Sequence, residues 1–322
     1  NSRPVPMRSI ETLIQARWLI PVEPEGCLEH HSVAIDGGRI LELLPSAQAH
    51  QKYEARRTVK LHHHALIPGL VNPHTHAAMT LFRGLADDLT LADWLQRHIW
   101  PAETTWVSPD FIRDGTQLSI AEMLRSGTTC FNDMYFFPDI VAQVAAEAGI
   151  RACVGLILID FPTAWAQTPE EYIDKGLAVY DALRHSELIR TAFAPHAPYT
   201  VSDAPLERMR VLADELGLPV HMHVHETAQE IEEAVARHGL RPLERLRRAG
   251  LVNPQLLAVH MTQLERAEIE LLAANGVHVV HCPESNLKLG SGFCPVKELL
   301  AAGINVALGT DGAASNNDLD ML

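Results

Sequence analysis

The sequence predicts an α/β protein, a (β/α)8 barrel of the TIM type preceded by a small β-domain. From residue 65 onward, eight apolar strand-like runs alternate with helix-like stretches, the pattern of a barrel with an outer ring of helices. Glycine follows several of these stretches, as in Ala148-Gly149 and Leu216-Gly217, where it can end a helix in the left-handed conformation. A chain of 322 residues, 47% of them hydrophobic, is long enough to bury such a core.

The predicted elements follow one another along the chain. The strand-like runs are residues 65–71, 128–132, 151–158, 189–194, 219–224, 256–260, 278–281 and 305–309. The helix-like stretches are residues 114–125, 138–148, 169–184, 204–216, 228–249, 263–274 and 296–301. Seven helices separate eight strands, and only eleven residues (322 − 311) follow Asp311. We therefore expect the closing helix, and further strands of the small domain, to belong to a segment beyond the given chain.

Residues 1–64 predict the small β-domain, the first part of a composite sandwich, and residues 65–322 the metal-dependent barrel. Short apolar runs occupy residues 12–14, 17–20, 32–35 and 39–43. Asp36-Gly37-Gly38 separates the last two runs and is typical of a hairpin turn. Residues 1–7 are expected to be a loose leader.

Charge and cysteine usage restrict the partners. Acidic residues outnumber basic ones by 40 to 26, a net charge of −14 that argues against nucleic acids and anionic membranes as partners. No apolar run reaches the about 18 residues of a membrane span, and no signal peptide opens the chain. The five cysteines form no C-x-x-C pair and are typical of reduced thiols. We expect a cytoplasmic protein with a small-molecule substrate, and leave a homo-oligomer open.

Candidate metal ligands stand where predicted strands end, the rim at which barrel active sites form. His74 and His76 are two residues apart, so they share a face and can bind one ion. Asp311 ends the eighth strand, which lies beside the first in a closed barrel. Imidazoles with a carboxylate suit a borderline-soft divalent metal that activates water. No lysine lies in residues 189–196 to bridge two ions, which favours one metal.

The fifth strand offers three histidines, His221, His223 and His225, on one face. Their spacing leaves the third ligand open, although proximity to the rim favours His223 or His225. Glu226 then stands beside the metal, where a carboxylate can transfer protons. His260 ends the sixth strand and is expected to face the cavity.

The remaining histidines differ in their setting. His196 lies between two prolines at the end of the fourth strand, where it is held stiffly and is a candidate for substrate contact. His278 and His281 are expected near the cavity wall. Surface positions are expected for His30, His31, His50, His62, His63 and His64.

Together these residues resemble the amidohydrolase superfamily and, within it, the 5-methylthioadenosine/S-adenosylhomocysteine deaminases, near the triazine hydrolases and chlorohydrolases. The resemblance spans nearly all of residues 10–322. It rests on Pro-Gly-Leu-Val-Asn-Pro-His-Thr-His at 68–76, Arg-Gly-Leu-Ala-Asp-Asp at 83–88, Trp-Leu at 94–95, Trp-Pro-Ala-Glu at 100–103, His-x-x-Glu at 223–226, Cys-Pro-Glu-Ser-Asn-Leu-Lys-Leu-Gly at 282–290 and Leu-Gly-Thr-Asp-Gly-Ala-Ala-Ser-Asn-Asn at 308–317.

The resemblance implies one zinc per subunit, with Fe²⁺ or Mn²⁺ as alternatives, and assigns its ligands. These are His74, His76, His223 and Asp311. It also implies that Glu226 carries protons between water and the purine ring.

The resemblance further implies how a nucleoside is bound and turned over. Glu103 is placed against the ribose hydroxyls, and His196 at the nucleoside. Asp311 takes a second proton, and His260 hydrogen-bonds the reacting centre. Some members hold the homocysteine carboxylate with an arginine on the third strand, where this chain has Leu156. That difference favours 5′-methylthioadenosine or adenosine over S-adenosylhomocysteine.

The expected activity is hydrolytic deamination of the adenine ring of a 5′-modified adenosine, which yields the inosine analogue and ammonia. Alternatives within the class are guanine or cytosine deamination and hydrolysis of a triazine. The alternative from another class is a non-catalytic scaffold, which is disfavoured because such relatives usually lose metal ligands and this chain keeps all of them.

Overall fold

A computed structural model describes residues 7–322, which divide into two compact units. One unit ends at Gly69 and the other begins at Leu70. The leader expected at residues 1–7 lies almost wholly outside the described residues. No helix in residues 7–322 is both long and apolar enough to cross a bilayer.

The first unit is built on a four-stranded sheet in the order β3-β2-β1-β4. Its elements are β1 (Arg8–Leu19), β2 (Leu28–Asp36), β3 (Arg39–Pro45), α1 (Ser46–Lys52) and β4 (Tyr53–Leu66). Gly37 and Gly38 form the predicted hairpin turn, with φ of +57° and +70° that favour glycine. The two short runs expected at residues 12–14 and 17–20 are one continuous strand.

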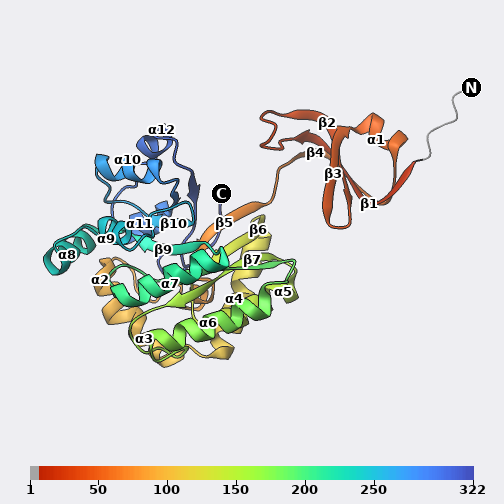
Figure 1. The fold of residues 1–322 in the computed structure, drawn as a ribbon. Coiled ribbons are helices and arrows are strands. Elements are labelled where there is room, and N and C mark those ends of the chain that lie inside the picture. The colour runs from red at the N-terminus through yellow and green to blue at the C-terminus, as the bar shows by residue number, and fades with distance from the viewer. Residues whose placement is uncertain (1–6) are drawn as a thin grey trace, which may run out of the picture. The chain divides into compact units, whose positions relative to one another are not determined.

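The second unit is the predicted (β/α)8 barrel, because eight parallel strands follow one another in sequence order. They are β5 (Leu70–Thr75), β6 (Thr128–Asp133), β7 (Arg151–Leu158), β8 (Ile189–Pro195), β9 (Val220–Val224), β10 (Leu256–His260), β11 (His278–His281) and β12 (Val306–Leu308). Figure 1 shows α4, α5 and α6 beside the strands β6 and β7. The fold class predicted from the sequence is confirmed.

The connecting helices explain where the predicted boundaries shift. The helices between strands are α4 (Pro109–Arg125), α5 (Pro138–Ala148), α6 (Pro169–Leu183), α7 (Asp203–Leu216), α8 (Ala228–His238), α9 (Pro242–Arg248), α10 (Arg266–Ala274) and α12 (Val296–Ala301). The single helix expected at residues 228–249 is two helices. Gly239 ends α8 in the left-handed region (φ +68°), and Pro242 begins α9.

Five short elements carry parts of the rim that periodicity did not predict. They are η1 (Ala77–Phe82), α2 (Leu91–Trp94), η2 (Leu95–Ile99), α3 (Trp100–Trp106) and α11 (Pro283–Lys288). Each is seven residues or shorter, and such short helices leave almost no hydrophobic repeat to detect.

The first barrel strand begins later than expected. Residues 65–71 were predicted to form it, but Ala65 and Leu66 pair with Trp18 and Leu19 in the small sheet. The strand of the barrel, β5, instead spans Leu70–Thr75, so His74 lies within it.

Side chains join β5 to the segment after β12. The Asn72 amide donates to Thr310 Oγ1 (2.7 Å), and the Thr310 N–H donates to Asn72 Oδ1 (3.1 Å). The Asp311 N–H donates to the His74 carbonyl at 3.0 Å. Asn72 and Thr310, 238 positions apart in sequence, are thereby held at the same rim.

We predict that Gly115→Ala destabilises the barrel. Gly115 lies in α4 against η1, and an added Cβ would meet the Ala78 carbonyl oxygen at 2.5 Å. Alanine favours a helix by at most about 1 kcal/mol over glycine, whereas overpacking against backbone costs about 1–3 kcal/mol. Chemical denaturation should therefore show a lower free energy of unfolding.

The matched control is Gln117→Ala, an exposed position of the same helix, which should leave the free energy of unfolding unchanged within about 0.5 kcal/mol. Equal stability of Gly115→Ala and the wild type would show that α4 and η1 can move apart without loss.

Candidate metal centre and active-site cavity

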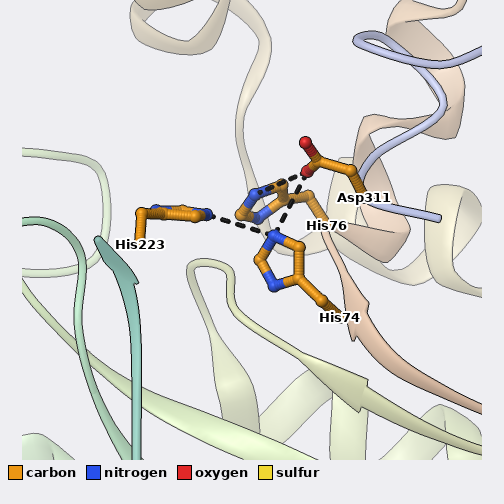
Figure 2. A group of neighbouring side chains, drawn as sticks. All are labelled: His74, His76, His223 and Asp311. Carbon is orange, nitrogen blue, oxygen red and sulfur yellow. Dashed lines mark hydrogen bonds and ion pairs between the residues drawn. The ribbon is translucent and has the colours of Figure 1, made fainter. Parts of the chain in front are cut away.

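Four buried side chains converge at the carboxyl ends of the barrel strands, as Figure 2 shows. They are His74 in β5, His76 directly after it, His223 in β9 and Asp311 after β12. Asp311 Oδ1 is 3.2 Å from Nε2 of both His74 and His76. Nε2 of His223 is 3.1 Å from Nε2 of His74. One donor atom from each residue therefore faces a common point.

Hydrogen bonds on the far side of each ring fix this arrangement. Nδ1 of His74 pairs with Nε2 of His221 at 2.9 Å. Nδ1 of His223 donates to the His196 carbonyl at 2.8 Å, and Nδ1 of His76 donates to the Met134 carbonyl. In all three rings Nε2 is left facing the common point. Partners that bond the other ring nitrogen usually orient a metal-binding histidine in this way.

The donor set and its spacing fit a divalent metal such as zinc. For metal–ligand bonds of about 2.0–2.1 Å, tetrahedral donor atoms lie about 3.3 Å apart. Three donor pairs here are separated by 3.1–3.2 Å, and all four donor atoms lie within 4.8 Å of one another. Burial lowers the pKa of His74 and of His223, which keeps both imidazoles neutral. Burial opposes ionisation of Asp311, but His74 and His76 outweigh it and hold the pKa of that carboxyl well below its usual range. Neutral imidazole and ionised carboxylate are the forms that bind metal.

Glu226 and His260 stand beside the metal ligands. Glu226 Oε2 lies 3.6 Å from His260 Nε2, and both residues are buried. The Asn286 amide donates to His260 Nδ1 at 3.0 Å, so the ring proton sits on Nε2, toward Glu226. Burial, followed by the negative charges of Asp311 and Glu230, raises the pKa of Glu226 well above its ordinary value. A raised pKa suits a carboxyl that accepts a proton and then releases it.

A cavity of about 450 Å³ opens over this group and is mainly apolar. Its lining includes Trp94, Trp100, Phe136, Ile157, Ile159 and Phe161, together with His196, Glu226 and His260. No arginine or lysine of the described chain lines it. A concave apolar site of this size with a few convergent polar groups suits a small organic ligand.

Glu103 and Tyr135 supply a polar edge to the cavity. The Tyr135 hydroxyl donates to Glu103 Oε1 at 2.7 Å, and both side chains line the cavity. Burial raises the pKa of Glu103 to about 7, although the Tyr135 bond opposes the shift. His196 also lines the cavity, and burial lowers the pKa of His196 to about 3.

The structure brings together every predicted site residue except Leu156. That side chain packs toward Gly176 of α6, whereas Ile157 and Ile159 of the same chain segment line the cavity. Alternation along a strand accounts for the difference. His278 and His281, expected near the cavity wall, are absent from its lining among the described residues; His278 pairs with Asn305 instead. His30, His50 and residues 62–64 are exposed as predicted, and His31 is half-buried.

Sequence reasoning gave no role to several residues that support the site. These are His221 behind His74, Tyr135 beside Glu103, Asn286 behind His260, and Ser285, whose hydroxyl donates to Asp311 Oδ2 at 2.6 Å. Ser285 and Asn286 lie in the motif at 282–290, which was the available signal. Nothing in the alternation of residues 221–225 could identify His221, since period two treats the three histidines alike.

A barrel with this donor set defines a metal-dependent hydrolase, and comparison with known proteins gives its family. The amidohydrolase family model matches residues 65–322. The chain belongs to the amidohydrolase family.

Two curated relatives have informative names. A 5-methylthioadenosine/S-adenosylhomocysteine deaminase of Saccharophagus degradans is 54% identical over 312 residues, which cover 97% of this chain and 70% of the relative. A 5′-deoxyadenosine deaminase of Methanopyrus kandleri is 44% identical over 306 residues, covering 94% of this chain and 70% of the relative.

Solved structures agree on the fold. An adenosine deaminase from Xanthomonas campestris with bound zinc superimposes with a TM-score of 0.97 at 57% identity, over 98% of this chain and 72% of that one. Atrazine chlorohydrolase from Arthrobacter aurescens TC1 gives a TM-score of 0.89 at 24% identity, over 96% of this chain and 74% of that one. The second likeness shows a shared fold only.

We predict that His74→Ala and Asp311→Ala each lower bound zinc to well below one per chain and abolish turnover. Each change removes one of four convergent donors, and the three that remain are held too stiffly to replace it. Metal analysis of the purified protein measures the first effect. Two tightly bound metals per active chain would contradict the site described here.

We predict the opposite metal result for Glu226→Gln. The amide keeps the size of the side chain but cannot carry a proton, so activity should fall by at least about 10²-fold. Zinc content should remain near one per chain, because Glu226 is not among the four convergent donors. Loss of zinc in Glu226→Gln together with retention in His223→Ala would reverse the two assignments.

Proposed function

We propose that this protein is a zinc-dependent deaminase that hydrolyses the adenine amino group of a 5′-modified adenosine, giving the inosine analogue and ammonia. The observation that carries the proposal is the placement of four metal donors and the Glu226–His260 pair at the floor of a cavity with a polar edge at Glu103. The names of the relatives at 54% and 44% identity support this substrate class.

In this proposal the protein binds one metal ion. His74, His76, His223 and Asp311 would hold a single zinc. A zinc ion in such a site lowers the pKa of water, so that hydroxide is available at neutral pH.

The remaining roles fall to side chains around the cavity floor. Deamination adds water at C6 of the ring and expels ammonia, so two protons must move from the water. Glu226 accepts the first proton from the water and delivers it to ring N1. General acid–base catalysis of this kind accelerates a reaction by about 10²–10⁴-fold. Asp311 accepts the second and passes it to the leaving amine. His260, whose Nε2–H points toward Glu226, donates to the oxygen that adds.

The polar edge formed by Glu103 and Tyr135 binds the ribose in this proposal. Glu103 offers carboxylate oxygens to the two ribose hydroxyls, while Tyr135 occupies Oε1 and fixes the orientation of the group. His196, which also lines the cavity, contacts the nucleoside. A guanine or triazine substrate has no diol, which disfavours these alternatives, and the triazine and guanine enzymes among the neighbours share the fold only, at 24% and 23% identity.

We further propose that the enzyme acts in the cytoplasm on a free nucleoside, without a nucleic-acid or membrane partner. A net charge of −14 would repel polyanions, and all five cysteines are free thiols.

We predict that 5′-methylthioadenosine has a higher kcat/KM than S-adenosylhomocysteine. The cavity wall is apolar, and it offers no guanidinium or ammonium group among the described residues to pair with a homocysteine carboxylate. Arg83, a conceivable partner, is bound to Glu122 at 2.6 Å. Loss of adenine absorbance across a panel of adenosine, 5′-deoxyadenosine, 5′-methylthioadenosine and S-adenosylhomocysteine measures the preference.

A preference for S-adenosylhomocysteine of tenfold or more, about 1.4 kcal/mol, would overturn the apolar assignment of the 5′ subsite. Failure to release ammonia from every nucleoside in the panel would overturn the proposed function, and guanine, cytosine and triazine substrates would then be tested.

We predict that Glu103→Gln lowers kcat/KM for adenosine by about 10–10²-fold, because a charge-assisted acceptor for the diol is lost. The matched comparison is 2′,3′-dideoxyadenosine, which has no diol to bind. The wild type should favour adenosine over it, and the variant should lose most of that preference. An undiminished preference in the variant would place the ribose elsewhere.

A further inference from the structure

The backbone beneath Glu226 has an unusual conformation. Residues 225–227 connect β9 to α8 and present Glu226 to the cavity floor. His225 has φ of +54°, in the left-handed region that residues other than glycine seldom adopt. Such a conformation persists only where surrounding contacts determine it.

Glu230 supplies two of these contacts. Its Oε1 accepts the His225 N–H at 3.1 Å, and its Oε2 accepts the Glu226 N–H at 2.7 Å. Glu230 lies in the first turn of α8, where its own N–H donates to Thr227 Oγ1 at 3.1 Å. A glutamate at this position of a capping box ordinarily bonds the N-cap N–H. Here the Glu230 carboxylate instead bonds the N–H groups of Glu226 and His225, which lie one and two residues before the N-cap Thr227.

Thr262 bonds the carbonyl groups of the same two residues, His225 and Glu226. Its hydroxyl donates to the Glu226 carbonyl at 2.6 Å, and its N–H donates to the His225 carbonyl at 2.9 Å. Glu230 and Thr262 are 6% and 8% exposed, so water competes little for these bonds. The backbone N–H and C=O groups of His225 and Glu226 are therefore all bonded to two buried residues.

We propose that Glu230 and Thr262 are positioning residues, which clamp the backbone at residues 225–226 and hold the Glu226 carboxyl in place for proton transfer. The assignment rests on the proposed function. A general base must lie within hydrogen-bond reach of the proton that it moves. A displacement of about 1 Å can cost about 10²-fold in rate, so a loosened segment should slow the chemical step while leaving the sugar contacts at Glu103 intact.

The chain contains a matched control, a threonine–glutamate helix cap of the same kind that lies away from the cavity. At the start of α6, Thr168 Oγ1 accepts the Glu171 N–H at 3.2 Å, and Glu171 Oε2 accepts the Gln167 N–H at 2.8 Å. The sequence pattern and the position in the helix match Thr227 and Glu230. Neither Gln167 nor Glu171 lines the cavity. A variant at Glu171 therefore shows how loss of such a bond affects the fold without affecting the cavity.

The experiment compares Glu230→Gln with Glu171→Gln in the full chain. A glutamine has one acceptor oxygen, so Glu230→Gln loses one of the two backbone bonds. We expect kcat for 5′-methylthioadenosine to fall about tenfold or more, with KM within about threefold of the wild type and zinc near one per chain. Glu171→Gln should leave kcat, KM and zinc content unchanged, whatever it does to the melting temperature.

A second pair of variants decides the case if Glu230→Gln fails to fold. Thr262→Val removes the hydroxyl that donates to the Glu226 carbonyl, whereas Thr262→Ser keeps it. We expect a fall in kcat for the valine variant and recovery of most of it in the serine variant, again at nearly constant KM.

Three outcomes would overturn the clamp: wild-type kcat in Glu230→Gln, a loss of kcat that only follows loss of zinc, or equal kcat in Thr262→Val and Thr262→Ser. A wild-type chain that deaminates no nucleoside in the panel removes the proposed function and this assignment with it. If the wild type is active and the variants at Glu230 and Thr262 are unaffected, the positioning role is wrong but the proposed function stands.

Discussion

The organisation of the site depends on closure of the barrel between β5 and the segment after β12. Asn72 bonds Thr310 through both ends of its amide, and the Asp311 N–H donates to the His74 carbonyl. These bonds place an acidic side chain from the end of the barrel against two imidazoles from its beginning. Asp311 Oδ1 then lies 3.2 Å from both rings. Without this closure, the carboxylate and the His-x-His pair would be separate surface groups with no shared ligand.

Burial of the four candidate metal ligands is tolerated because each one has a hydrogen-bond or ion-pair partner. Nδ1 of His76 and of His223 donates to the Met134 and His196 carbonyls, and Nδ1 of His74 pairs with His221, which leaves the three Nε2 atoms for a cation. Asp311 is held ionised by the imidazoles on one oxygen and by Ser285 on the other. Glu226 has no such partners on its carboxyl, and burial raises its pKa. The same rim thus contains one carboxyl whose pKa is lowered, as a metal ligand requires, and one whose pKa is raised, a difference that their environments create.

Specificity and catalysis are assigned to different walls of the cavity. On the proposed function, apolar side chains from α2, α3 and the segment after β7 would surround a 5′ substituent, and Glu103 with Tyr135 would contact the sugar. The proton-carrying group instead stands on the β9–α8 connection, which Glu230 and Thr262 hold from both sides. Substrate range can therefore vary through the short helices near the rim without disturbing the geometry of proton transfer.

The sequence determined the fold class, the order of strands and helices, and the residue types at the rim, because hydrophobic periodicity and glycine at helix ends are local signals. The ligand set followed from resemblance, since spacing alone could not choose among His221, His223 and His225. Only the tertiary structure decided that His221 supports His74 from behind, that Leu156 faces α6 instead of the cavity, and that residues 65–66 belong to the small sheet. It also revealed that Glu230 reaches back to the catalytic segment. The first three outcomes depend on contacts between residues that lie tens or hundreds of positions apart, which no local pattern encodes. The Glu230 contacts span only four and five residues, but they depend on the conformation of the chain at His225, which the sequence pattern did not reveal.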